Sequence, residues 1–257
     1  MGAPQAERDA IKDADYRKWA NERESEPTLT VIAEGFWLAD SPCTQAFWHT
    51  VMGDTPSHFK DAPDRAERPV EEVTWDDVEK FVLRFASTPE WGCERRLGLP
   101  TEAQWEYAAR AGSRTAFWWG EDANSAMANW DGEQRGTTPV KRYPANPWGL
   151  FDVHGNVWEW CADLWRQRLD SPEVEPDQGA RVVRGGSWGH HPGRARSACR
   201  RRGHQGLRHR TLGFRFALRS SSHQGAEPQQ GVLRPGGPAG RPAGLLEVVC
   251  AMLADLD

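Results

Sequence analysis

The sequence predicts an α+β domain in which two main helices accompany a small sheet and much irregular chain. Residues 74–86 and 101–112 carry helix start signals and apolar residues at spacings of three and four, which are typical of amphipathic helices. Residues 112–181 instead alternate short apolar pieces with Gly, Pro, Asn and Asp. The 257-residue chain contains 14 Trp, and so many large rings must be buried, which excludes disorder throughout.

The first elements along the chain are short. Residues 1–27 are highly charged with little apolar periodicity, a pattern compatible with a frayed helix ending near Trp19 or with a docked arm. Residues 28–38 alternate well enough to predict a strand. Residues 44–52 predict a short helix that ends at Gly53.

The two main helices have the clearest signals. Thr74 precedes two acids that suit a first helical turn. The apolar stripe of this helix is Val78, Phe81, Val82 and Phe85. Thr101 and Gln104 form the capping-box pattern of the second helix, and Gly112 is its stop signal.

Two later segments complete the predicted domain, and a change of composition closes it. Residues 181–188 and 212–219 contain the β-branched and aromatic side chains that suit strands of a sheet core. Residues 220–244 are rich in Gly, Pro, Ser and Gln, which predicts a linker. Residues 245–257 have a helical apolar stripe, for docking on the domain or on a partner. The predicted domain is therefore 28–219.

The charge of the chain is unevenly distributed. Residues 181–219 contain eleven Arg, four His and no acid, whereas the rest of the chain carries 21 basic and 37 acidic residues. Such a basic island either binds an anionic or carboxylate-bearing partner or pairs with carboxylates of its own fold. Because the surrounding protein is acidic and would repel a phosphate backbone, the pattern argues against nucleic acid as a partner.

No stretch approaches the roughly 18–20 apolar residues of a membrane span, and no signal peptide is visible, so we expect no membrane partner. The five cysteines are few and scattered, which favours free thiols and a cytoplasmic protein. They are Cys43, Cys93, Cys161, Cys199 and Cys250.

Several strings in order resemble the formylglycine-generating enzyme (sulfatase-modifying factor) family over about residues 28–219. Among them are Leu99-Pro100-Thr101-Glu102-Ala103-Gln104-Trp105-Glu106-Tyr107, Gly155-Asn156-Val157-Trp158-Glu159-Trp160, Arg184-Gly185-Gly186-Ser187-Trp188 and Leu212-Gly213-Phe214-Arg215. The resemblance implies a C-type-lectin-like fold with a small twisted mixed sheet. Family membership alone does not decide function, because the family includes copper oxidases that make formylglycine from cysteine, domains attached to iron-dependent sulfoxide synthases, and variable proteins of diversity-generating retroelements.

The oxidases of this family bind Cu(I) through two cysteines that follow the Arg-Gly-Gly-Ser-Trp-like string. Counting from that string here reaches His190 and Ala195, so we expect no copper. The iron branch needs three histidines from a helical domain, and residues 1–27 contain none. An oxidoreductase acting on a protein cysteine, as in sulfatase maturation, stays as the alternative function. It would need an unorthodox copper site, for example Cys199 with His190 or His191.

The resemblance also implies a structural calcium site at Asn156, Val157 and Glu159, because oxygen ligands suit Ca²⁺. Asn129 with Trp130 resembles part of a second site, although the loop that follows is short. The alternative interpretation of residues 155–160 is a buried turn in which Glu159 is satisfied by the backbone or by Arg.

Residues 189–211 are the predicted binding surface for a protein or other ligand, which makes a non-catalytic binding protein the expected function. In retroelement variable proteins this interval is diversified chiefly at asparagine codons, which cannot yield Trp, Met, Lys, Gln or Glu; only Gln205 here belongs to that group. We assign Arg196 and Arg200 to structural pairing, and His190, His191, His204 and His209 to the surface before any metal. The contact candidates are His190, His191, Gly193, Arg194, Cys199, Arg201, Gly203, His204, Arg208, His209, Arg210 and Thr211.

Overall fold

Three helices of the domain begin at threonine caps, of which those at Thr74 and Thr101 were predicted. In the computed structural model, which describes residues 1–87, 95–169 and 179–220, each cap hydroxyl accepts the backbone N–H three residues on. Residues Thr44, Thr74 and Thr101 cap α3 (Gln45–Met52), α4 (Trp75–Ala86) and α5 (Glu102–Arg110). Helix α5 ends at Ala111 in a left-handed conformation (φ 45°), one residue before the expected stop.

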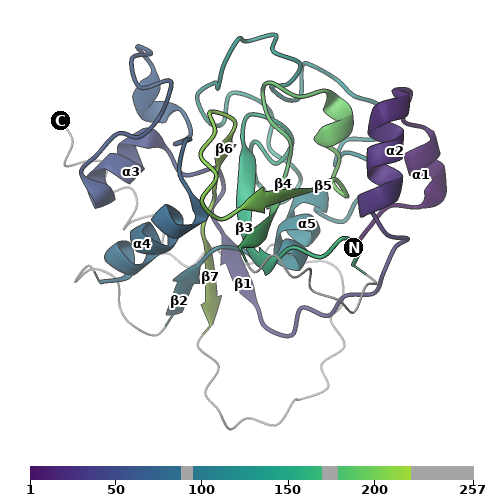
Figure 1. Cartoon of the computed structure of the whole chain (residues 1–257), viewed down its shortest axis with the longest axis horizontal. Coiled ribbons are helices and arrows are strands. Elements are labelled where there is room, and N and C mark those ends of the chain that lie inside the picture. The colour runs from purple at the N-terminus through teal and green to yellow at the C-terminus, as the bar shows by residue number, and fades with distance from the viewer. Residues whose placement is uncertain (88–94, 170–178, 221–257) are drawn as a thin grey trace, which may run out of the picture.

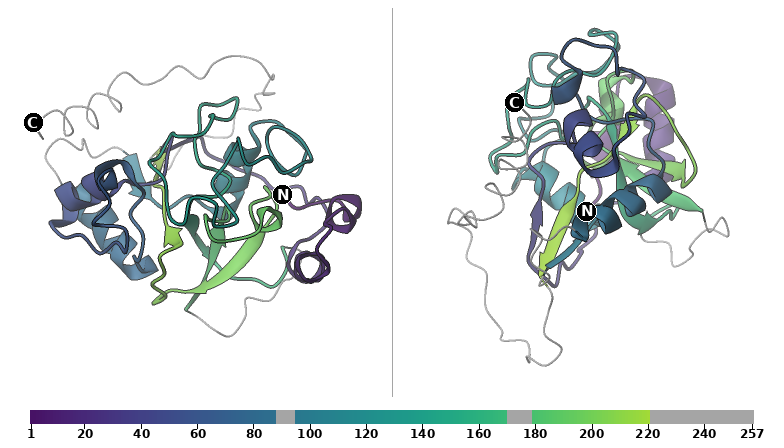
Figure 2. Two further views of the ribbon diagram at one scale, coloured as in Figure 1. Left: turned by 90° about the horizontal axis from the view of Figure 1, so that it is seen from above. Right: turned by 90° about the vertical axis from the view of Figure 1, so that its left-hand side faces the viewer.

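The first 27 residues form a docked arm. Helix α1 (Gln5–Asp9) and helix α2 (Ala14–Arg23) lie at one side of the molecule, away from α3 and α4 (Figures 1 and 2). Asp13 caps α2, which continues to Arg23 and not to Trp19 alone. The arm is joined to the domain by buried polar contacts, since Gly2 N–H donates to Glu106 (2.9 Å).

The strands form two sheets. The first is antiparallel, with the order β1-β7-β2. The second has the order β5-β4-β3-β6 and is mixed, because β3 pairs antiparallel with β4 and parallel with β6. The strands are β1 (Phe36–Leu38), β2 (Arg95–Gly98), β3 (Trp158–Leu164), β4 (Ala180–Arg184), β5 (Arg200–His204), β6 (Leu212–Gly213) and β7 (Ala217–Ser220).

The predicted strands are shorter in the structure, and three strands were missed. Residues 28–38 contribute only β1. The strand expected at 181–188 ends at Arg184, because Gly185 and Gly186 adopt φ values of 95° and 75° that a strand does not allow. The segment expected at 212–219 is interrupted between β6 and β7. Strands β2, β3 and β5 were not predicted.

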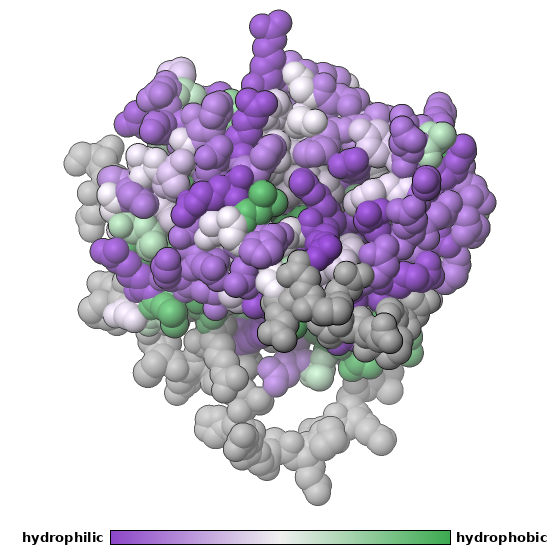
Figure 3. All heavy atoms as spheres, viewed as in Figure 1, coloured by the Kyte–Doolittle hydropathy of each residue, from purple (hydrophilic) through white to green (hydrophobic). Residues whose placement is uncertain are grey.

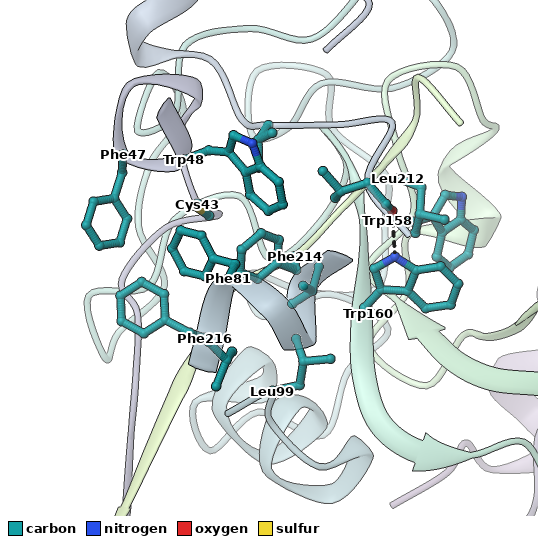
Figure 4. Packing of buried hydrophobic residues seen from close by; sticks show 14 of the residues in the cluster. Cys43, Phe47, Trp48, Phe81, Leu99, Trp158, Trp160, Leu212, Phe214 and Phe216 are labelled. Atoms are coloured by element: carbon teal, nitrogen blue, oxygen red, sulfur yellow. Dashed lines mark hydrogen bonds between the residues drawn. The ribbon is translucent and has the colours of Figure 1, made fainter. Parts of the chain in front are cut away.

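The larger core is aromatic. Phe47, Trp48, Phe81 and Phe214 from α3, α4 and the β6–β7 connection meet in stacked and edge-to-face pairs (Figure 4). The indole N–H of Trp160, on β3, donates to the carbonyl oxygen of Val73 (3.0 Å), so its ring is buried without an orphaned donor.

Buried arginines account for much of the basic island. Arg184, Arg196, Arg200 and Arg215 are each at most 4% exposed and form ion pairs with carboxylates of the same chain. Arg196 pairs with Glu7 and Glu24 of the arm, and Arg200 with Glu102, so the structural role expected for both is confirmed. The segments predicted as a linker (220–244) and a terminal helix (245–257) lie outside the described residues, apart from Ser220. None of the described helices is long and apolar enough to cross a membrane.

A buried histidine predicts acid sensitivity. His154 donates from Nδ1 to the Ala195 carbonyl (2.6 Å) and accepts from Trp118 N–H, and burial lowers its pKa to about 3. Because the unfolded chain binds this proton near pH 6.5, the stability of the neutral folded form is present above that pH and is lost as pH falls from 6.5 towards 3.

The wild type should be more stable than His154→Gln at pH 7. We expect this difference in the free energy of unfolding to decrease by about 2 kcal/mol between pH 7 and pH 5. Urea unfolding of both proteins at the two pH values measures it. An unchanged difference in stability would contradict a buried, neutral His154.

Candidate ligand pocket

A pocket of about 420 Å³ opens at the predicted binding segment. Its walls come from residues 188–191 and 209–211, with Tyr16 from α2 and residues 131–132 from a loop. The side chains of the face in Figure 3 are mostly hydrophilic, without a broad apolar patch among those coloured. The two ends of the predicted segment therefore meet across one pocket, while the arm contributes a third wall.

The pocket frame is held by its backbone. Trp188 N–H donates to the Asn156 carbonyl (2.9 Å), and the Trp188 indole N–H donates to the Arg210 carbonyl (3.1 Å). From the facing loop, Gly132 N–H and Asp131 N–H donate to the carbonyls of Trp188 and His190 (2.6 and 3.1 Å). These bonds fix the walls, so exposed side chains can change while the frame persists.

His190 is neutral at physiological pH. Desolvation first, and then the charges of Arg201 and Arg194, lower its pKa to about 4. Its Nδ1 lies 2.6 Å from the Ser187 hydroxyl and 3.4 Å from the Trp158 indole nitrogen.

His191 and His209 also line the pocket. His191 stacks on Tyr16 of the arm, with ring centroids 4.7 Å apart. His209 lies 2.7 Å from the Thr211 hydroxyl, and burial with neighbouring arginines lowers its pKa. Adjacent histidines of a strand would point to opposite faces, but His190 and His191 lie in a turn before a short 3-10 helix, and both reach the pocket.

Of three further contact candidates, the structure places one in the pocket wall and two outside it. Thr211 is buried and forms part of the pocket wall, whereas His204 and Arg208 do not line the pocket. Arg208 instead pairs with Asp77 at the start of α4 (2.7 Å). His204 is the last residue of β5.

Gly193, Arg194 and Arg201 lie near the pocket, outside its wall. Arg194 covers the ring of Tyr16, and Arg201 lies over Trp158. The half-buried Gly193 donates its N–H to His191 Nδ1 (3.0 Å), so it shapes the pocket through the backbone.

Two candidates are corrected. Cys199 is fully buried in the aromatic core, and desolvation together with Glu24 raises its thiol pKa to about 12. Gly203 is buried against Trp160, where an added Cβ would lie 2.7 Å from the ring. Neither residue can contact a ligand in this fold.

The alternative copper site is not supported by these positions. Cys199 is fully buried in the core, and the second family position is occupied by the buried Ala195, which has no ligating side chain. Within the three described ranges, no group of three or more His, Cys, Asp or Glu is arranged to hold a metal ion.

The residues expected at the calcium site do not fit Ca²⁺. Both oxygens of Glu159 accept from the Arg215 guanidinium (2.6 and 2.8 Å), and one also accepts from the Trp105 indole. Asn156 uses its side-chain oxygen on Thr138 N–H and its amide group on the Thr138 carbonyl. Val157 is fully buried. A cation would displace an arginine here, so the alternative of a buried turn describes these residues.

Four pocket residues lie outside the predicted segment 189–211. Tyr16, Asp131, Gly132 and Trp188 lie far apart in the chain, and only the docking of the arm and loop brings the first three to the predicted segment. Trp188 stood at the edge of that segment and was assigned to the frame.

The comparison with protein families agrees with this architecture. The Sulfatase-modifying factor enzyme 1-like domain matches residues 7–220. The chain belongs to this family. The match begins at residue 7, inside the docked arm.

Several curated proteins are similar to the chain. The formylglycine-generating enzyme of Thermomonospora curvata is 33% identical over 182 residues, which cover 62% of this chain and 55% of that protein. The serine/threonine-protein kinase Pkn1 of Chlamydia caviae is 38% identical over 165 residues, which cover 60% of this chain and 25% of the kinase. The chain thus spans about half the length of these relatives or less.

Solved structures confirm the C-type-lectin-like fold of the family. Treponema denticola variable protein 1 has a TM-score of 0.63 and 26% identity, over 72% of this chain and 84% of that one. PvdO from Pseudomonas aeruginosa has a TM-score of 0.67 over 86% of this chain and 90% of that one, at 24% identity, and supports the fold alone.

Proposed function

We propose that this family member is a non-catalytic binding protein that holds a protein or other ligand at residues 189–211. The observation that carries the proposal is the pocket, whose walls come from both ends of that segment. The middle of the segment contains Arg196, Cys199 and Arg200, which are buried and hold the frame. Exposed residues on a fixed frame are what a binding surface requires.

We further propose that the surface is diversified, as in retroelement variable proteins. The fold shared with a Treponema denticola variable protein supports this, as does the composition of the segment. The free thiols Cys43, Cys161 and Cys199 support action in the cytoplasm.

Burial predicts where such variation can occur. Across a population of the source organism, we expect substitutions at codons of exposed or half-buried residues such as Gly189, His191 and Arg210, and invariance at Arg196 and Arg200. A new side chain at the buried positions would remove the arginine partner of Glu24 or the closer of the two arginine partners of Glu102. Deep sequencing of the 3′ portion of the gene measures this. A uniform segment, or variation spread equally over buried codons, would contradict diversification.

The competing function is oxidation of a protein cysteine, which identity to formylglycine-generating enzymes favours. Incubation of the protein with Cu(I), oxygen and a cysteine-containing sulfatase peptide tests it directly. We expect the peptide cysteine to stay unchanged, because Cys199 is a buried thiol. Formylglycine in the peptide would overturn the non-catalytic proposal.

A further inference from the structure

The three pocket histidines have one tautomer in common. Trp158 indole N–H donates to Nδ1 of His190, Gly193 N–H to Nδ1 of His191, and Thr211 N–H to Nδ1 of His209. These three contacts measure 3.4, 3.0 and 3.3 Å. Indole and backbone N–H groups donate only, and the Ser187 and Thr211 hydroxyls, 2.6 and 2.7 Å from Nδ1 of His190 and His209, can donate there as well. These contacts favour Nδ1 as an acceptor and place the proton of each neutral ring on Nε2.

This arrangement leaves the pocket with an excess of donors. Each imidazole has Nε2–H as its remaining polar group, and Arg210 adds a guanidinium without any acceptor. A metal ion can bind Nε2 of a neutral imidazole only when the ring proton is on Nδ1. Because Nδ1 faces an N–H group here, that tautomer is disfavoured, and so is metal binding through Nε2. The group that complements such a lining is an acceptor with negative charge.

The pocket lining contains a single carboxylate. Asp131 is the only carboxylate among the pocket-lining residues, and it is exposed. Arg210 lies over the ring of Trp188, 5.4 Å from its centroid, so a planar group beside it meets an aromatic surface. A ligand with one carboxylate or phosphate group therefore complements these donors better than a cation does.

We propose that this pocket binds the anionic oxygens of its ligand, a carboxylate or a phosphate, through Arg210 and the Nε2–H groups of His190, His191 and His209. The inference rests on the proposed binding function and specifies the ligand chemistry of its site. A charge-assisted hydrogen bond from Arg210 to an oxyanion would be its strongest single contact.

Calorimetric titration of the whole protein at pH 7.5 with glutarate, inorganic phosphate and the neutral glutaramide tests the proposal. We expect saturable binding of glutarate or phosphate, and the stronger of the two identifies the anion. Arg210→Gln should weaken binding at least tenfold, because it removes a charged donor. The matched control is Arg208→Gln, in the same segment but paired with Asp77, which should leave affinity within twofold.

Nitrogen NMR of the histidine side chains adds an independent readout, with Nε2–H resonances expected for all three rings and shifted by the anion. Proton placement on Nδ1, equal binding of glutaramide, equal loss in Arg208→Gln, or no binding of either anion would overturn the inference. Such a result would leave the binding function itself standing if population sequencing shows the segment to vary. Anion binding with a uniform segment would instead refute diversification alone.

Discussion

Replacement of Arg215 by Met is expected to lower the free energy of unfolding by about 3–5 kcal/mol. The guanidinium is fully buried and contacts both oxygens of Glu159, at 2.6 and 2.8 Å. It also donates to the carbonyls of Phe151 and Ala39 (2.8 and 3.2 Å). Removal of Arg215 leaves the buried Glu159 carboxylate with a hydrogen bond from the Trp105 indole but without its arginine partner, and desolvation of the unpaired charge is unfavourable.

Urea unfolding at pH 7 measures this loss. Arg208→Gln breaks an exposed ion pair and should change stability by less than about 1 kcal/mol, which makes it the control. Combining Arg215→Met with Glu159→Gln should recover part of the loss, because the unpaired charge is removed. A decrease below about 1 kcal/mol in the single variant would contradict the buried-pair account.

Replacement of Glu24 by Ala is expected to lower the free energy of unfolding by about 3 kcal/mol and to loosen the arm. Glu24 is fully buried, and its two oxygens lie 2.5 and 3.1 Å from the guanidinium of Arg196. Glu7 is the only carboxylate partner that Arg196 would keep among the described residues. Because the arm also brings Tyr16 to the pocket, loosening it should weaken anion binding.

Two measurements check this prediction. Urea unfolding gives the stability, and limited proteolysis within residues 1–27 reports the docking of the arm. Glu22→Ala is the control, since Glu22 pairs with Arg23 at the surface. A Glu24→Ala protein with unchanged stability and unchanged protease resistance would show that the arm is held by other contacts.

The helices were predictable because their signals are local. Thr74 and Thr101 form capping boxes with residues three positions away, and the stripe on α4 turns its apolar side chains to the core. Caps and spacing depend on neighbours within one or two turns, so a single sequence is enough to find them.

The strands were less predictable because tertiary contacts decide them. The segment from Arg200 to His204 has no alternation of apolar residues, yet it becomes β5 through pairing with β4. Its first residue is buried by an ion pair to Glu102, a residue 98 positions away. A basic run of this kind looks like a solvated surface until its distant partner is known.

The candidate site shows the same division. His190, His191, His209 and Arg210 were placed on the ligand surface from their segment alone, and all four line the pocket. Cys199 was placed there too, but the chain turns it into the core. The contributions of Tyr16 and Asp131 depend on how the arm and a distant loop dock.

The amino-acid sequence by itself determined the family, the α+β class, the helix caps and the segment that carries the pocket, because these follow from short strings and local spacing. Only the tertiary structure decided which arginines are buried pairs, which thiol is inaccessible, and that donor-only groups hold one tautomer in three histidines. Burial and hydrogen-bond partners arise from residues far apart in the chain, and the chemistry of this pocket depends on both.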